Sequence, residues 1–175
     1  NGALGGPGAA NLSVALGAIL DLPDVSYSAL GGSLLLNGGT LSISSGSSSF
    51  ERPIVLGAGG GFLAMGGPAT VGSLNGEITG GSLTIQGGGR VYLNGSNAFT
   101  GVLTINQGTF TVSNSTGLGS PTGATVVAPG AVLEWAAPGA GLNFGAESFT
   151  LSGNGTGAGV LRSLAGTNSF SGGVT

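Results

Sequence analysis

Hydrophobic residues occupy every second position in many short segments of this chain of 175 residues. Such alternation over four or five residues predicts a β-strand with one face turned inward. Gly, Asn and Ser separate the segments, as at 37–39 and 86–89, where glycine supplies the positive φ that a corner needs. The segments that we expect to form strands are 33–36, 40–44, 82–85, 90–93, 102–105, 109–113, 124–128, 131–135, 148–152 and 160–164.

One passage of the chain occurs twice. Residues 95–104 have the sequence GSNAFTGVLT, and residues 166–175 have the similar sequence GTNSFSGGVT. A second, weaker echo relates 17–22 (GAILDL) to 130–135 (GAVLEW). Internal repetition indicates an array of similar units, each of which buries its apolar face against its neighbours.

Two architectures accommodate many short strands: an antiparallel sandwich or barrel, and a parallel β-solenoid. Hairpins favour two-residue loops between longer strands, whereas a solenoid needs short strands, frequent corners and like residues stacked from coil to coil. The observed pattern favours the solenoid, and Phe50, Phe99 and Phe170 are expected to mark one recurring position. Coils of roughly 20 to 30 residues would give about six to eight coils and a rod roughly 30 to 40 Å long.

The alternation also assigns the sides of the strands. Asp21 and Glu134 are expected to point outward at equivalent positions of the second echo, and Arg162 outward from its own strand. No unpaired charge would then be buried. The expected core consists of Leu20, Leu22, Leu41, Ile43, Leu83, Ile85, Val91, Leu93, Leu103, Ile105, Phe110, Val112, Leu133, Trp135, Phe149 and Leu151.

The composition excludes several classes of protein. Glycine accounts for 40 residues, and each glycine in a helix interior costs about 1 kcal/mol relative to alanine, so long helices are excluded. The glycines keep no three-residue period, which excludes collagen. A hydrophobic fraction of 40% argues against disorder. With three arginines, no lysine and a net charge of -3, nucleic acid is not an expected partner.

The sequence has neither cysteines nor an apolar segment of the kind that crosses or targets a membrane. Cysteine is absent, so packing and hydrogen bonds must stabilise the fold without disulfides. No apolar run approaches the roughly 20 residues that cross a bilayer, and no basic, apolar start marks a secretion signal. We expect residues 1–175 to form a single solenoid segment of a longer repeat array, uncapped at both ends and without a membrane span.

The charged residues are the candidate catalytic groups, because enzymes on parallel β-helices use clustered carboxylates. Asp21 and Asp24 flank a proline and predict a turn, and the pair Glu51-Arg52 predicts a solvated corner. No aspartate follows the glycine clusters as calcium-binding repeats require, and no lysine follows them as phosphate loops require. The acids are Asp21, Asp24, Glu51, Glu77, Glu134 and Glu147. We expect no catalytic residues, no cofactor and no metal site.

From about residue 80 onward the chain resembles the autotransporter-associated β-strand repeat, which occurs in passenger domains of bacterial autotransporters. Residues 95–114, GSNAFTGVLTINQGTFTVSN, followed by TGLG at 116–119, keep the order of parts of that repeat, with Phe99 in place of its common tyrosine. Residues 153–172 are similar to a second variant. The resemblance implies a right-handed parallel β-helix, exported to or beyond the bacterial surface as a stalk, adhesin or matrix component, with no catalytic residues in the repeat.

The expected function is therefore a structural or adhesive rod of an exported bacterial surface protein or extracellular fibre. Head-to-tail self-association and surface glycans are its candidate partners. One alternative is a carbohydrate-binding module, in which Tyr27, Tyr92 and Phe62 should line an exposed groove. The other is a polysaccharide-degrading enzyme, in which three carboxylates should converge on one face.

Overall fold

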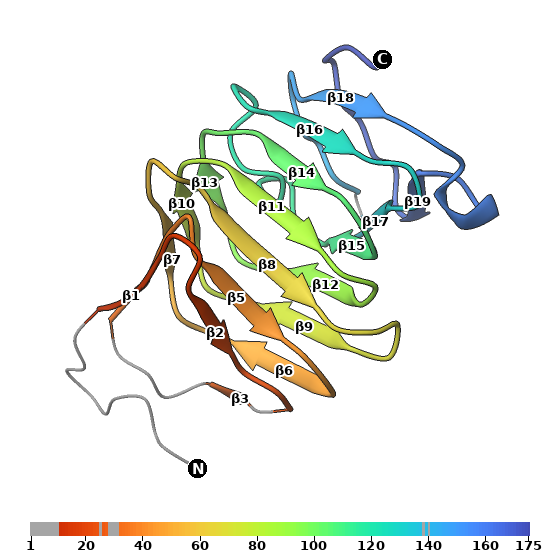
Figure 1. Cartoon of the computed structure of the whole chain (residues 1–175). Coiled ribbons are helices and arrows are strands. Elements are labelled where there is room, and N and C mark those ends of the chain that lie inside the picture. Colours follow the sequence, from red (N-terminus) through yellow and green to blue (C-terminus); the bar gives the residue numbers. More distant parts are fainter. Residues whose placement is uncertain (1–10, 25, 28–31, 138, 140) are drawn as a thin grey trace.

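The computed structural model describes residues 11–24, 26–27, 32–137, 139 and 141–175. Their strands wind into a parallel β-solenoid of about six turns, which confirms the expected architecture (Figure 1). Across this part of the chain the helical structure is limited to one 3-10 turn, Gly155–Gly157.

Three parallel sheets form the faces of the solenoid (Figure 1). Sheet A contains β1 (Leu12–Ala15), β4 (Leu34–Asn37), β7 (Ile54–Leu56), β10 (Ile78–Gly80) and β13 (Ala98–Phe99). Sheet B contains β2 (Ile19–Asp21), β5 (Thr40–Ile43), β8 (Gly61–Met65), β11 (Leu83–Gln86), β14 (Leu103–Ile105), β16 (Ala124–Val127) and β18 (Ser148–Leu151). Sheet C contains β3 (Ser26–Tyr27), β6 (Ser47–Phe50), β9 (Val71–Leu74), β12 (Arg90–Leu93), β15 (Thr109–Val112), β17 (Val132–Ala136) and β19 (Leu161–Ala165).

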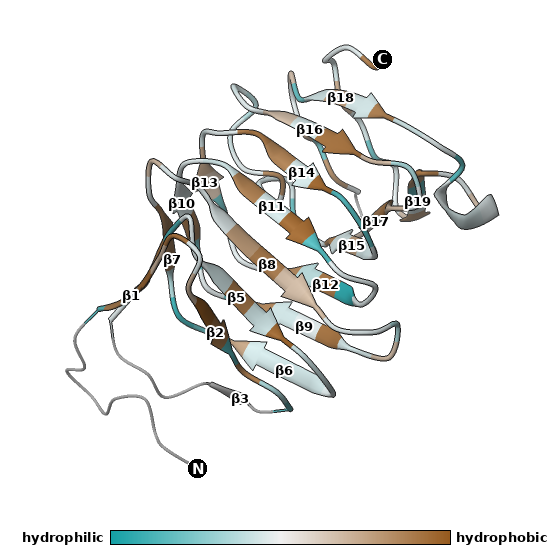
Figure 2. Ribbon diagram, viewed as in Figure 1, coloured by the Kyte–Doolittle hydropathy of each residue, from teal (hydrophilic) through white to brown (hydrophobic). Residues whose placement is uncertain are grey.

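Like residues stack on like residues from coil to coil. Leu83 of β11 pairs with Leu103 of β14, and Ile85 pairs with Ile105 in the same ladder. Neighbouring strands lie about 4.8 Å apart, so the seven strands of sheet B extend over about 30 Å. Figure 2 shows apolar and polar residues alternating along these strands, as expected when one face of each strand is buried.

All but two of the predicted core residues are buried. Leu20 and Leu151 are half-buried and pack against the core from the first and last strands of sheet B, whereas the other predicted core residues are buried. Sequence reasoning missed the interior residues of β6 to β10, none of which it predicted. These residues include Phe50, Ile54, Leu56, Leu63, Met65, Leu74 and Ile78.

The two copies of the repeated passage occupy equivalent positions in coils that lie three coils apart. Leu103 pairs with Thr125, Thr125 pairs with Phe149, and Phe149 forms a β-bridge with Val174. Leu103 and Val174 are equivalent residues of the two copies, so the repeat confirms the prediction of an array.

The asparagine of the repeated passage has the same role in both copies. Asn97 Oδ1 accepts a hydrogen bond from the backbone N–H of Ile78, at 3.0 Å, in the preceding coil. Asn168 Oδ1 accepts one from the backbone N–H of Leu142 at 2.7 Å. The asparagine therefore joins successive coils at a corner where the strand ladder is short.

Two predicted equivalences are wrong. Asp21 lies in sheet B and Glu134 lies in sheet C, so the second echo does not mark one position. Phe50 belongs to sheet C, whereas Phe99 belongs to sheet A. All three sheets use the same apolar alternation, so a short sequence match does not identify the face to which a strand belongs.

Candidate functional site

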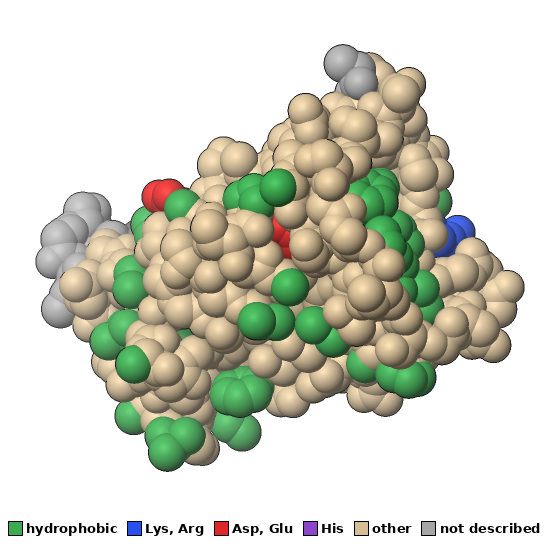
Figure 3. Space-filling model, turned by 90° about the horizontal axis from the view of Figure 1, so that it is seen from above, with side chains coloured by type: hydrophobic (Ala, Val, Ile, Leu, Met, Phe, Trp, Pro, Cys, Tyr) green, Lys and Arg blue, Asp and Glu red, His purple; other side chains and the backbone are tan. Residues whose placement is uncertain are grey.

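Among the described residues, the accessible arginine side chains lie in one small region of the molecule. Figure 3 shows one face of the molecule, on which backbone and uncharged polar side chains predominate, with scattered apolar groups and few charged side chains. The sequence contains three arginines and no lysine or histidine. Arg52 is only 3% exposed, whereas the side chains of Arg90 and Arg162 are 34% and 38% exposed.

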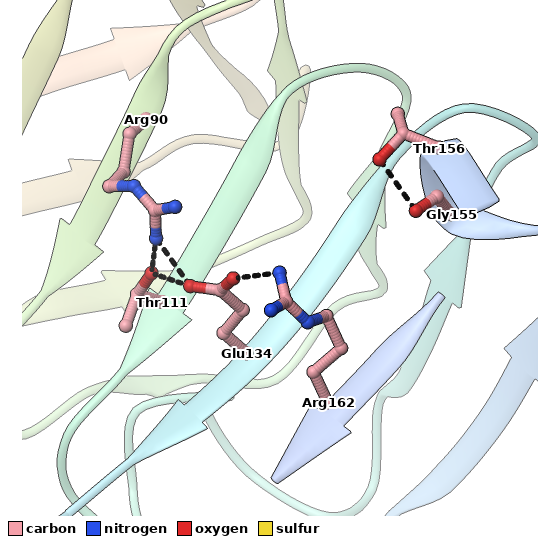
Figure 4. Close-up of polar contacts among 6 residues, drawn as sticks. All are labelled: Arg90, Thr111, Glu134, Gly155, Thr156 and Arg162. Carbon is pink, nitrogen blue, oxygen red and sulfur yellow. Dashed lines mark hydrogen bonds and ion pairs between the residues drawn. The ribbon is translucent and has the colours of Figure 1, made fainter. Parts of the chain in front are cut away.

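Arg90, Thr111, Glu134 and Arg162 form a polar cluster on the outer face of sheet C, here named the Arg–Glu cluster (Figure 4). They come from β12, β15, β17 and β19, which are successive strands of that sheet. Thr111 pairs with Glu134, and Glu134 pairs with Arg162, so their side chains leave the sheet on the same side.

The two arginines approach one carboxylate from opposite sides (Figure 4). Arg90 Nη1 donates to Thr111 Oγ1 at 2.8 Å and forms an ion pair with Glu134 Oε2. Arg162 Nη1 forms the second ion pair, at 2.8 Å from Glu134 Oε1. Thr111 Oγ1 also donates to Glu134 Oε2, at 3.2 Å. Both carboxylate oxygens therefore have charged partners.

The expected outward orientation of Glu134 and Arg162 is confirmed, but the Glu134 side chain is only 2% exposed because its partners cover it. The hydrogen bond to Glu134 raises the pKa of Arg90 above its usual value. The Arg90 guanidinium carbon also lies 5.8 Å from the centroid of the Tyr92 ring, within the range of a cation–π contact. Both arginines are therefore held in defined positions while remaining partly accessible.

The predicted turn at Asp21 and Asp24 is confirmed. Asp21 ends β2, and Pro23 and Asp24 form a turn with Asp24 at a φ of 45°. The Ser44 hydroxyl donates to Asp21 Oδ2 at 2.7 Å, and this hydrogen bond lowers the pKa of Asp21. The two carboxylates bond to serines of the next coil and do not face a common centre.

The prediction for residues 51–52 is half wrong. Glu51 is exposed, as expected, and hydrogen bonds from the Ser49 hydroxyl and the Asn75 amide lower its pKa. Arg52 is buried, and it donates to the backbone oxygens of Gly32 at 3.4 Å and Ser33 at 3.3 Å. Carbonyl groups of a neighbouring coil replace water around this guanidinium.

Side-chain amides and hydroxyls form a polar ladder along the corner after sheet C. Asn75 Nδ2 donates to Glu51 Oε1 at 2.6 Å, and Asn94 Nδ2 donates to Asn75 Oδ1 at 2.8 Å. The Ser113 hydroxyl continues the ladder with a bond of 3.1 Å to Asn94 Oδ1. This ladder borders the face that carries the Arg–Glu cluster, because Asn94 follows the last residue of β12.

A buried carboxyl group that sequence reasoning did not single out lies just before β18. Glu147 is 2% exposed, and the buried Thr125 hydroxyl donates to its Oε1 at 2.7 Å. Desolvation raises the pKa of Glu147. Only the structure shows this burial, because Glu147 directly precedes the expected strand 148–152 and the alternation assigns it no side.

The features expected of the two alternative functions are not brought together. Among the described residues, no group of three or more His, Cys, Asp or Glu side chains could hold a metal ion. Tyr92 lies in sheet C and Phe62 in sheet B, so they do not line one groove, and the side chain of Tyr27 lies outside the described part.

No helix in the part of the chain that the structure describes is long and apolar enough to cross a membrane. Comparison with protein-family models, with curated proteins and with solved structures gives no match to this chain. The resemblance to the autotransporter-associated repeat therefore stays a prediction, and functional inference rests on the geometry described above.

Proposed function

We propose that this chain is a rod-forming segment of an exported bacterial surface protein or extracellular fibre, with a structural or adhesive role and no catalytic activity. The observation that carries the proposal is the unbroken stacking of sheets B and C, each with seven parallel strands. In a solenoid each coil contacts only its neighbours, so the structure gains length by the addition of coils and presents a regular lateral surface.

The state of the carboxylates supports a structural role over an enzymatic one. Hydrolysis of a glycosidic bond uses two carboxyl groups that flank the substrate, one of which has a raised pKa. Glu147 has the raised pKa but is buried against Thr125, and Glu134 is neutralised by two arginines. Asp21 and Glu51 are engaged in hydrogen bonds that lower the pKa of each.

The last described coil supports the idea of head-to-tail stacking. Val174 continues the interior column of Leu103 and Phe149, yet it is 51% exposed. At the other end, Leu20 belongs to the interior of β2 and is half-buried. Among the described residues, β2 and β3 have a neighbouring strand on one side only, and such edges favour the addition of a further strand. We propose that the coil containing Val174 stacks on β1, β2 and β3 of a second copy.

Val174→Asp tests this proposal, with Val102→Asp as the matched control. Val102 is 39% exposed and lies on the side of the solenoid, immediately before β14. Sedimentation velocity over a concentration series, together with electron microscopy, should show elongating rods for the wild type and for Val102→Asp, and monomers for Val174→Asp. Compact wild-type monomers at every concentration would contradict the fibre-forming function.

A further inference from the structure

The Arg–Glu cluster has one more positive charge than negative charge, in a chain whose net charge is -3. Within the described residues, Arg162 donates through Nη1 to Glu134, whereas Arg90 donates through Nη1 to Thr111 and Glu134 and also forms a side-chain hydrogen bond with Tyr92. The Nε and Nη2 groups of Arg162 have no protein acceptor in that part of the chain. Because both side chains are about one third exposed, these donors are within reach of a ligand.

We propose that Arg90, Arg162 and Tyr92 bind the carboxylate and ring of an acidic sugar, such as a uronic acid residue of a polysaccharide. A guanidinium group matches a carboxylate in charge and in planar, two-pronged geometry. Tyr92 lies two residues after Arg90 in β12, on the same side of sheet C, and its ring is partly exposed. The site therefore combines cationic donors with an aromatic ring beside them.

Glu134 positions the site without needing to contact the ligand. It holds both guanidinium groups through its two oxygens, and Thr111 fixes Arg90 from the neighbouring strand. Long side chains that are already ordered lose less conformational entropy when a ligand binds. The cluster is thus preorganised for an anion, although its central carboxylate is itself an anion.

The surroundings favour an acidic glycan over nucleic acid. Two accessible cations cannot neutralise a row of phosphates, which nucleic acid binding requires. The polar ladder that includes Asn94 and Ser113 borders the same face and offers amide and hydroxyl groups to sugar hydroxyls. This site lies on the side of the solenoid, so it does not depend on the end-to-end stacking proposed above.

Titration calorimetry of the full chain with an oligogalacturonate, and with a neutral oligosaccharide of equal length, tests the proposal. We expect binding of the acidic oligomer alone, weakening when salt rises from about 50 to 200 mM. Arg162→Gln should weaken binding about tenfold, as expected for loss of a charged hydrogen bond. Glu77→Gln alters an exposed carboxylate outside the cluster and should bind at least as well as the wild type.

Two further variants separate a binding site from a purely structural ion cluster. Tyr92→Leu keeps every charge and should still weaken binding, because the aromatic ring is lost. Glu134→Gln removes the charged partner that orders both guanidinium groups and should also weaken binding, because Arg90 and Arg162 are no longer held in place. Thermal unfolding of each variant establishes that it is folded. Absence of wild-type binding at millimolar oligomer, or equal affinities for wild type, Arg162→Gln and Tyr92→Leu, would overturn the proposal.

Discussion

Gly119 shows how closely a single residue can be fitted into the solenoid interior. Its φ is +86°, and a Cβ atom at this position would lie 2.6 Å from the ring of Phe99. Only glycine has ready access to this backbone conformation, and only a residue without a side chain allows the ring so close. The glycine content of the chain therefore has a steric cause as well as a conformational one.

Gly119→Ala should lower the free energy of unfolding by about 2 to 4 kcal/mol, through backbone strain and the clash with Phe99. Gly130→Ala is the matched control, since Gly130 has a φ of +88° and open space where a Cβ would lie. That variant should lose only about 1 kcal/mol from strain. Urea unfolding measures both values, and equal losses would show that Phe99 does not restrict position 119.

Glu147 should make stability depend on pH in an unusual direction for a carboxyl group. Burial raises its pKa in the folded chain above the ordinary value of 4.5, so the folded state binds the proton more tightly than the unfolded state. This contribution is fully present below the unfolded pKa and is lost as the pH rises through the folded pKa.

Glu147→Gln should remove this dependence while retaining the hydrogen bond from Thr125. Relative to the wild type, the variant should become progressively more stable as the pH is raised from about 4 to 8. Unfolding curves at several pH values test the effect. Wild-type and variant stabilities that run parallel over this range would show that Glu147 does not titrate in a buried site.

At the scale of the element, the corner at Asn97 joins three coils. Its Oδ1 accepts the Ile78 backbone N–H, and its Nδ2 donates to the Gly117 carbonyl oxygen at 3.0 Å. Asn97 is 4% exposed, so water does not readily replace it. Asn168 shares the bond that Oδ1 accepts from a backbone N–H of the preceding coil, and this common bond accounts for the Asn-x-Phe sequence in both copies of the repeated passage.

Asn97→Ala should lower the free energy of unfolding by about 2 to 4 kcal/mol, because two buried backbone groups lose their partner. Asn106→Ala, at an exposed position after β14, is the control and should change stability by less than about 0.5 kcal/mol. Chemical denaturation provides the comparison. A loss for Asn97→Ala as small as that of the control would mean that water satisfies the two backbone groups.

Strand prediction succeeded where the alternation was regular and failed where it was short. Segments 82–85 and 102–105 alternate cleanly, and they form β11 and β14. β7 is the apolar run Ile-Val-Leu, and β10 is Ile-Thr-Gly. Three residues are too few to establish a period of two, so both strands were missed.

The Arg–Glu cluster could not be predicted because its residues are brought together by the register of the coils. Arg90 pairs with Thr109, whereas Leu133 pairs with Leu161 across a longer stretch of chain. Without those coil lengths, no spacing in the sequence places Arg90 and Arg162 beside Glu134. The burial of Arg52 is equally hidden, since its partners are backbone carbonyl groups, which any residue supplies.

At the scale of the whole molecule, the outer column of sheet B runs from the first to the last described coil. Ile19 pairs with Thr40 at one end, and the hydroxyl groups of Thr150 and Thr175 lie 3.3 Å apart at the other. Continuation of the same ladder into another copy would place Thr175 beside Ile19 of that copy. Neighbouring strands would then bring the two Cα atoms to about 4.8 Å, within the range of a disulfide.

Cross-linking of a double variant, Ile19→Cys with Thr175→Cys, tests this stacking most directly, because the chain has no cysteine of its own. Both positions are exposed, so the substitutions leave the core intact. Oxidation should give a ladder of covalent multimers. The control pair, Ile19→Cys with Val55→Cys on the outer face of sheet A, should give no such ladder. A double variant that stays monomeric under oxidation, or a control that forms the same multimers, would contradict a rod built by in-register stacking.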